Sequence, residues 1–140
     1  MTISTRDFGK MDIDENSVLE FKLPILGFAE FRKFVILYDD EIGDSFAWLQ
    51  SIDSSDVCFI IIDPMRFIPD YAPALPEEML AKIGSSANGA ALRCLMVVRT
   101  GIEDATVNLK SPIIINPAKK LAGQIVLDED YPVRAALAQL

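Results

Sequence analysis

The sequence predicts a mainly β fold: a small closed or nearly closed β-barrel of short strands, with two short helices. Three observations predict it. Short apolar runs with strand character recur along the chain, separated by Gly, Pro, Asp and Ser. Only two stretches have helical character. The length of 140 residues suits one domain with a real hydrophobic core, so residues 1–140 are expected to form a single domain.

The first half of the chain is predicted to form strands joined by turns. Residues 18–22 alternate apolar and polar side chains, as a half-buried strand does, and 34–38 form an apolar run that ends at acidic residues. A turn rich in Ser and Asp at 53–56 predicts a hairpin between its two flanking runs. The strands expected in this half cover residues 2–7, 11–15, 18–22, 34–38, 46–50 and 57–62.

A short helix follows a stretch interrupted by prolines. Pro76 suits its first turn, two glutamates follow, and Gly84 is a natural stop. The apolar residues at helical spacing, which should share one face, are Leu75, Met79, Leu80 and Ile83.

Beyond this helix, residues 85–91 predict a loop of small residues. Further strands are expected at 92–100, 106–109, 113–116 and 124–127. The composition of 133–140 predicts the second helix, with Asp130 as cap and Pro132 in the first turn.

The charge of the chain argues against direct nucleic-acid binding. Lys and Arg number 13 against 21 Asp and Glu, giving a formal net charge of -8. Such a surface repels phosphates. Solubility alone explains an acidic surface, and the alternative is an acidic face that steers a basic protein partner.

No catalytic or metal-binding constellation stands out in the sequence. No histidine is present, and no close cysteine pair offers a metal site, so no catalytic residue, cofactor or metal is expected. Cys58 and Cys94 lie in apolar runs and are expected to be buried free thiols, although a disulfide between them stays open. No apolar run is long enough to span a membrane and the N-terminus is polar, so a cytoplasmic protein is expected.

An ordered series of segments resembles one family of proteins. The segments that carry the resemblance are Phe8-Gly9, Leu19-Glu20-Phe21, Gly27-Phe28, Trp48-Leu49-Gln50-Ser51, Pro69-Asp70-Tyr71, and the stretches 106–116 and 123–134. In this order they resemble the bacterial flagellar assembly factor FliW over nearly the whole chain. One departure is Pro24-Ile25-Leu26, where the family usually has Gly-Leu-Pro or Gly-Ile-Pro.

The resemblance implies a non-catalytic regulatory binding protein of flagellar assembly. Its implied partners are flagellin and CsrA, a small basic RNA-binding protein that represses flagellin translation. Binding CsrA would relieve that repression. A small-ligand-binding β-barrel or an unrecognised enzyme is the alternative function.

Two segments are candidates for contact with a partner. The first contains Asn108, Leu109, Pro112, Ile113 and Asn116, because asparagines beside a strand interrupted by proline can offer hydrogen bonds to an incoming segment. The alternative is a core strand with two turn asparagines. The second is the aromatic and proline-rich loop with Phe67, Asp70 and Tyr71, which suits either an anchor for a partner or a lid on the end of the barrel.

Overall fold

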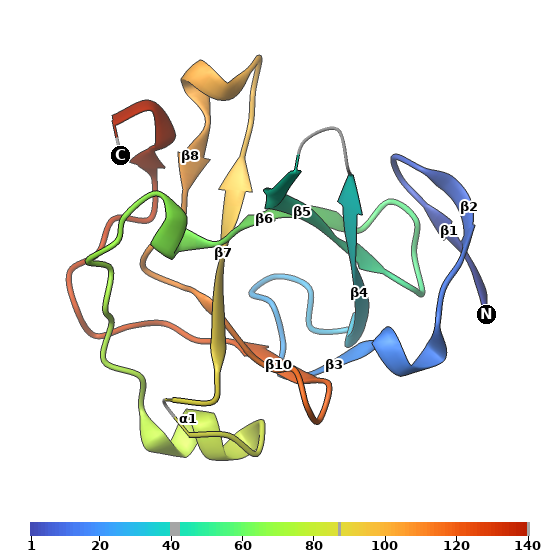
Figure 1. Cartoon of the computed structure of the whole chain (residues 1–140), viewed down its shortest axis with the longest axis horizontal. Helices are drawn as coiled ribbons and strands as arrows, with labels where there is room; N and C mark the ends of the chain where they lie inside the picture. The colour runs from blue at the N-terminus through green and yellow to red at the C-terminus, as the bar shows by residue number, and fades with distance from the viewer. Residues whose placement is uncertain (40–42, 87, 140) are drawn as a thin grey trace.

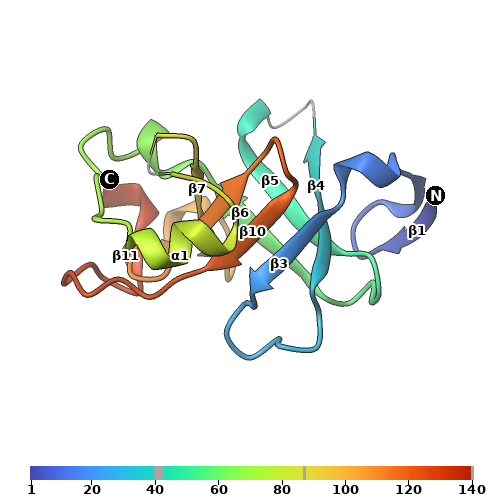
Figure 2. The same ribbon diagram turned by 90° about the horizontal axis from the view of Figure 1, so that it is seen from below.

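The computed structural model describes residues 1–39, 43–86 and 88–139, and its centre is a closed barrel of seven strands. Around the barrel the strand order is β7-β6-β5-β4-β3-β10-β9, and β9 pairs with β7 to close it. Figure 1 looks onto the barrel, and Figure 2 shows the short helix and the N-terminal hairpin lying outside it on opposite sides. The expected mainly β barrel is therefore confirmed.

The barrel strands are short, and all their pairings but one are antiparallel. The exception is the parallel pair of β3 with β10. Their bounds are β3 Leu19–Leu23, β4 Lys33–Asp39, β5 Gly43–Ser51, β6 Cys58–Ile62, β7 Ala91–Val97, β9 Ile113–Asn116 and β10 Leu121–Gln124. The hairpin predicted around 53–56 is confirmed, since β5 and β6 pair antiparallel with Gln50 opposite Cys58.

Side chains from every part of the barrel fill its interior. Alternation along β4 points Phe34 inward and Val35 outward, and both are buried because the outer face is covered as well. Phe21, Phe34 and Leu49 are each 0% exposed within the barrel core.

Three small layers cover the outside of the barrel. The hairpin of β1 (Thr2–Thr5) and β2 (Gly9–Asp12) packs on β4 and β5. The helix α1 (Glu77–Lys82) packs on β9 and the segment after β10. The short strands β8 (Thr106–Val107) and β11 (Ala135–Ala136) extend the sheet beyond β7 over a third apolar cluster.

The predicted apolar face of the first helix is confirmed. Leu80 and Ile83 are buried, and Leu75 and Met79 pack beside them in the same cluster. Pro76 stands one residue earlier than expected, as the N-cap residue rather than in the first turn. Gly84 follows the helix with a φ of 67°, a conformation that glycine adopts without strain.

The second predicted helix is wrong. Residues 135–136 form strand β11, paired with β8, and Leu137–Gln139 form a 3-10 turn; residue 140 lies outside the described part of the chain. The physical reason is tertiary: Ala135 and Leu137 are buried in the cluster beneath β8, and a helix this short has little stability of its own. Three further 3-10 turns, which the sequence analysis did not anticipate, are Glu15–Ser17, Pro64–Arg66 and Ile102–Asp104.

Several strand predictions also have wrong boundaries. The strand expected at 11–15 is β2 at Gly9–Asp12, and a 3-10 turn begins at Glu15. The strand expected at 2–7 ends at Thr5, and the one expected at 46–50 is longer, from Gly43 to Ser51.

Strand β10 lies at Leu121–Gln124, not at 124–127, although the extended residues Ile125 and Leu127 still donate to the carbonyls of Pro112 and Lys110. Strand β7 ends at Val97, because the Asp104 carboxylate binds the backbone of the turn at 99–101. Strand β8 ends at Val107 rather than at 109. Of the predicted small-residue loop at 85–91, residue 87 lies outside the described residues and 91 already belongs to β7.

The turn that departs from the family pattern is well formed. Phe28 donates its backbone N–H to the Ile25 carbonyl at 2.9 Å, and Gly27 has a φ of 86°. The Leu26 N–H donates a hydrogen bond to Oε1 of Gln124 at 2.8 Å, which connects the turn to β10.

Gly123 is required by the close approach of β10 to β3. A Cβ atom at this position would lie 2.7 Å from the Cβ of Leu23. We expect Gly123→Ala to destabilise the fold by about 1–3 kcal/mol, because two packed strands must move apart. Denaturant unfolding measures this.

Gly101→Ala is the matched control. Its new Cβ would meet only the Glu103 carboxylate, at the flexible end of a side chain, so little loss of stability is expected. Equal effects of the two substitutions would contradict the packing argument.

Candidate functional site

The first candidate segment is mostly part of the interior. Ile113 is 0% exposed in the barrel core, Leu109 is 4% exposed, and Pro112 is buried. These apolar side chains pack beneath the surface, so a partner cannot contact them directly.

The two asparagines of that segment hold turns. The Asn108 Oδ1 accepts from the backbone N–H groups of Lys110 at 3.1 Å and Ser111 at 3.0 Å. The Asn116 side chain donates to the carbonyls of Ile83 at 2.9 Å and Gly84 at 3.1 Å, which satisfies orphan acceptors at the end of α1. Turn and capping roles therefore account for both asparagines.

The second candidate segment has both buried and exposed members. Tyr71 is 1% exposed, and its hydroxyl donates to the Leu109 carbonyl at 2.7 Å. Phe67 is half-buried against Phe46, with ring centroids 5.7 Å apart, and Asp70 is exposed. The Tyr71 hydrogen bond thus brings the two candidate segments together on one side of the barrel.

Next to this loop lies a groove of about 540 Å³. Its lining residues come from the start of β7 and from the segments after β6 and before α1: Asp63, Met65, Ala72, Pro73, Ala74, Leu75, Ala90, Leu92 and Arg93. The lining of the groove is mostly apolar and contains one acidic and one basic side chain, Asp63 and Arg93.

The two thiols are not poised for chemistry. Both are free and buried, so the expected free thiols are confirmed and no disulfide joins them. Burial raises the pKa of Cys94 to about 12, and burial also raises the pKa of Cys58. Burial is the main cause of the raised pKa of the Tyr71 hydroxyl beside Cys94. Within the described residues, no group of three His, Cys, Asp or Glu side chains is arranged to hold a metal.

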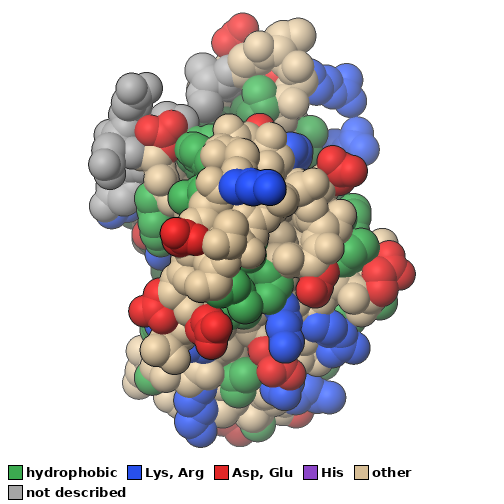
Figure 3. Space-filling view, turned by 90° about the vertical axis from the view of Figure 1, so that its right-hand side faces the viewer, with side chains coloured by type: hydrophobic (Ala, Val, Ile, Leu, Met, Phe, Trp, Pro, Cys, Tyr) green, Lys and Arg blue, Asp and Glu red, His purple; other side chains and the backbone are tan. Residues whose placement is uncertain are grey.

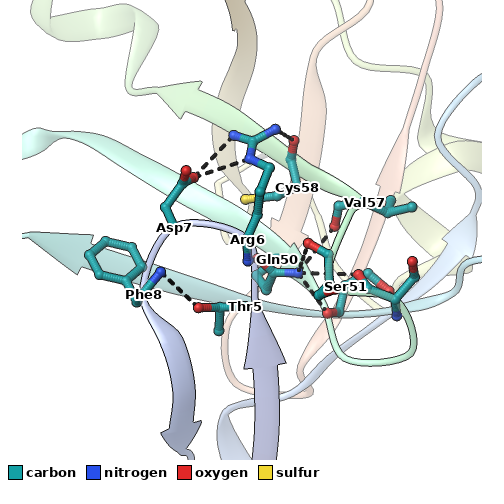
Figure 4. A network of polar contacts seen from close by, with 10 residues as sticks. Thr5, Arg6, Asp7, Phe8, Gln50, Ser51, Val57 and Cys58 are labelled. Atoms are coloured by element: carbon teal, nitrogen blue, oxygen red, sulfur yellow. Dashed lines mark hydrogen bonds and ion pairs between the residues drawn. The ribbon is translucent and has the colours of Figure 1, made fainter.

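A buried polar network beneath the N-terminal hairpin was missed by sequence reasoning. Gln50 is 0% exposed, and its Oε1 accepts from the Arg6 N–H at 3.0 Å. Its Nε2 faces the carbonyls of Ser51, Ser54 and Ser55 at 3.0–3.2 Å. Figure 4 shows this side chain between the hairpin turn and the β5–β6 turn, with Arg6 reaching the Cys58 carbonyl. No sequence pattern distinguishes this glutamine from an exposed strand residue.

The outer face of the hairpin carries mixed charge. Figure 3 shows basic and acidic side chains interspersed on that side of the molecule, so the net negative charge forms no continuous patch there. No helix in the described part of the chain is long and apolar enough to cross a membrane.

Gln50→Leu is expected to destabilise the protein by about 2–3 kcal/mol, because the Arg6 N–H and several turn carbonyls lose their buried partner. Urea denaturation measures the loss, and faster exchange of the hairpin amides should accompany it. Thr2→Val, which removes an exposed hydrogen bond of the same hairpin to Asp12, is the control with little expected effect. A Gln50→Leu protein as stable as the parent would refute the anchoring role.

Thiol labelling tests the burial of the cysteines. With a pKa of about 12, roughly 10⁻⁴ of Cys94 is thiolate at pH 8, against a substantial fraction of an exposed cysteine. We expect negligible alkylation of Cys94 in the native protein and rapid alkylation in denaturant. Native labelling of Cys94 at the rate of a free thiol would contradict the raised pKa.

Comparisons with known proteins agree with one another. A family model described as "FliW protein" matches residues 2–137. The chain is 37% identical over 134 residues to the flagellar assembly factor FliW of Caldicellulosiruptor bescii, covering 94% of this chain and 87% of that protein. It is 39% identical over 131 residues to FliW of Caldanaerobacter subterraneus, covering 93% of this chain and 87% of the relative.

A solved structure shares the fold. The crystal structure of a flagellar assembly factor FliW superposes with a TM-score of 0.90 at 29% identity, covering 98% of this chain and 96% of that one.

Proposed function

This chain belongs to the FliW family of flagellar assembly factors, and from that premise we propose that it binds two proteins, the translational repressor CsrA and flagellin. The observation that carries the proposal is the match of residues 2–137, nearly the whole chain, to the family. The relatives are named as assembly factors, and no reaction is proposed for this chain.

The proposed mechanism is competition between two partners in the cytoplasm. A protein that lowers the RNA affinity of CsrA must bind the RNA-free form of CsrA more tightly, by the same coupling free energy. Flagellin, bound at an overlapping or coupled surface, then prevents the chain from binding CsrA. When flagellin leaves the cell, CsrA is sequestered again and flagellin translation resumes.

The charge balance supports a protein partner over nucleic acid. A net charge of -8 attracts a basic protein and repels RNA phosphates. The proposed partners therefore do not include nucleic acid or a membrane surface.

The accessible part of the two candidate segments is the proposed contact. Asp70 is exposed and Phe67 is half-buried, so a partner can touch both. Tyr71 fixes that loop from below through its bond to Leu109. Asn108, Pro112, Ile113 and Asn116 hold the neighbouring backbone in shape.

The alternative of a small-ligand-binding barrel has less support. The interior positions that a ligand would occupy are filled by buried side chains such as Phe21, Phe34 and Ile113. Neither a barrel ligand nor an enzymatic reaction is favoured by a specific feature of the described residues.

Calorimetric titration of the chain with CsrA and with flagellin from the same organism tests the proposal. We expect binding to both. In stopped-flow mixing, Asp70→Lys should slow association with basic CsrA roughly threefold to tenfold at low salt, because it replaces an attractive charge. The difference should shrink as salt is raised.

Glu30→Lys makes the same change of charge at an exposed loop on another part of the surface and is the matched control. Equal slowing by both variants would place the contact elsewhere. No binding to either protein at tens of micromolar would refute the proposed function, since regulatory complexes are normally tighter.

A further inference from the structure

One stretch of barrel strand has an open edge. On one side, residues Ala91–Arg93 of β7 pair with β9. On the other side, pairing with β6 ends at Ile62 opposite Cys94. The ladder stops there because Asp63 caps a 3-10 turn and Pro64, which begins that turn, has no N–H to donate. No strand in the described ranges continues along this edge of residues 91–93.

The backbone groups at the open edge are those of Leu92. The Leu95 carbonyl accepts from the Asn108 N–H, so it faces β8 and β9. Main-chain groups of successive residues in an antiparallel strand point to alternate sides, so the N–H and C=O of Leu92 point the opposite way, toward the missing partner. The Arg93 guanidinium donates to the Leu92 carbonyl at 2.6 Å and covers it in the unbound protein. A charged side chain laid over an exposed strand edge is a common protection against unwanted pairing.

The groove of about 540 Å³ runs beside this edge. Leu92 and Arg93 line the groove together with the irregular segment 72–75. In Figure 1 the green segment that leads down to α1 lies to one side of the lower half of β7. The groove therefore places the unpaired main-chain groups of Leu92 beside a mostly apolar lining, as a site for one short added strand requires.

The charges in the groove specify the occupant further. Asp63 is already engaged, since it lies 3.7 Å from the Arg66 Nε and accepts from the Met65 N–H at 3.1 Å. The hydrogen bond that the structure gives Arg93 is to a neutral carbonyl, and no ion pair of Arg93 is formed within the described residues. The cation in the groove is thus available to a carboxylate.

We propose that this groove accepts an extended segment of a protein partner, which pairs with the Leu92 main chain as an added strand and places an acidic side chain against Arg93. On binding, a backbone N–H of the incoming strand replaces the Arg93 guanidinium as the hydrogen-bond donor to the Leu92 carbonyl. The released guanidinium then forms an ion pair with the carboxylate of the incoming segment. The inference rests on the proposed function, because the segment must belong to CsrA or to flagellin.

Hydrogen exchange at the Leu92 amide tests the added strand directly. The free protein is compared with its complexes, saturated in turn with CsrA and with flagellin. In one complex we expect exchange at Leu92 to slow at least tenfold. For the same partner, Arg93→Glu should raise the Kd at least tenfold, Arg93→Gln by less, and Arg93→Lys least of all.

Arg99→Glu provides the matched control, because Arg99 lies beyond the other end of β7 and lines a different pocket. Its Kd should change less than twofold. Thermal unfolding of each variant confirms that it is folded, and Arg93→Gln keeps the test valid if the glutamate variant is unstable.

The outcomes separate this inference from the proposed function. Binding to a partner with unchanged Leu92 exchange in both complexes, and with no effect of Arg93→Glu, overturns the added strand and leaves the proposed function standing. Absence of binding to both partners overturns both. If exchange at Leu92 instead slows as the concentration of the isolated protein rises, the groove binds a second copy of this chain. That result would also overturn the inference.

Discussion

Closure of the barrel through β9 is the constraint on which the rest of the structure depends. Strand β9 must pair with β10 on one side and with β7 on the other. The chain reaches that position only by stepping away from β8 between Leu109 and Pro112. The Asn108 side chain stabilises the turn at this step by accepting hydrogen bonds from two backbone N–H groups. Backbone groups near the step find partners in the C-terminal segment: the Leu109 N–H donates to the Pro132 carbonyl, and the Lys110 carbonyl accepts from the Leu127 N–H.

The outer layers follow from this closure. Asn116 at the end of β9 binds the carbonyls at the end of α1, so the helix is fixed to the strand that closes the barrel. Tyr71 binds the Leu109 carbonyl within the step, so the loop before the helix is fixed there too. The same arrangement leaves β7 paired with β9 on one side and open on the other beyond Ile62. A filled barrel with structured outer layers can act on other molecules only through its surface, which suits a binding protein.

Much of the fold was predictable because local patterns and tertiary structure agree. The apolar runs at β4 and β6, the Ser and Asp turn between β5 and β6, and the Pro, Glu and Gly signals around α1 all point to the structure observed. The C-terminal segment was not predictable, because pairing of Ala135 with Val107 overrides its helical composition. The boundary of β10 was also missed, since an extended chain continues past Gln124 with bonds to an irregular segment. For the candidate site, sequence alone could not separate the buried Ile113 and Tyr71 from the exposed Asp70, and it gave no sign of the buried role of Gln50.

We propose that this chain acts by occupying CsrA and is displaced by flagellin. The most direct measurement is the affinity of CsrA for its flagellin messenger RNA, titrated first with this chain and then with flagellin. We expect the affinity of CsrA for this RNA to fall as the chain is added and to recover as flagellin is added. If a saturating concentration of the folded chain leaves the affinity of CsrA for the RNA unchanged, the proposed function is contradicted.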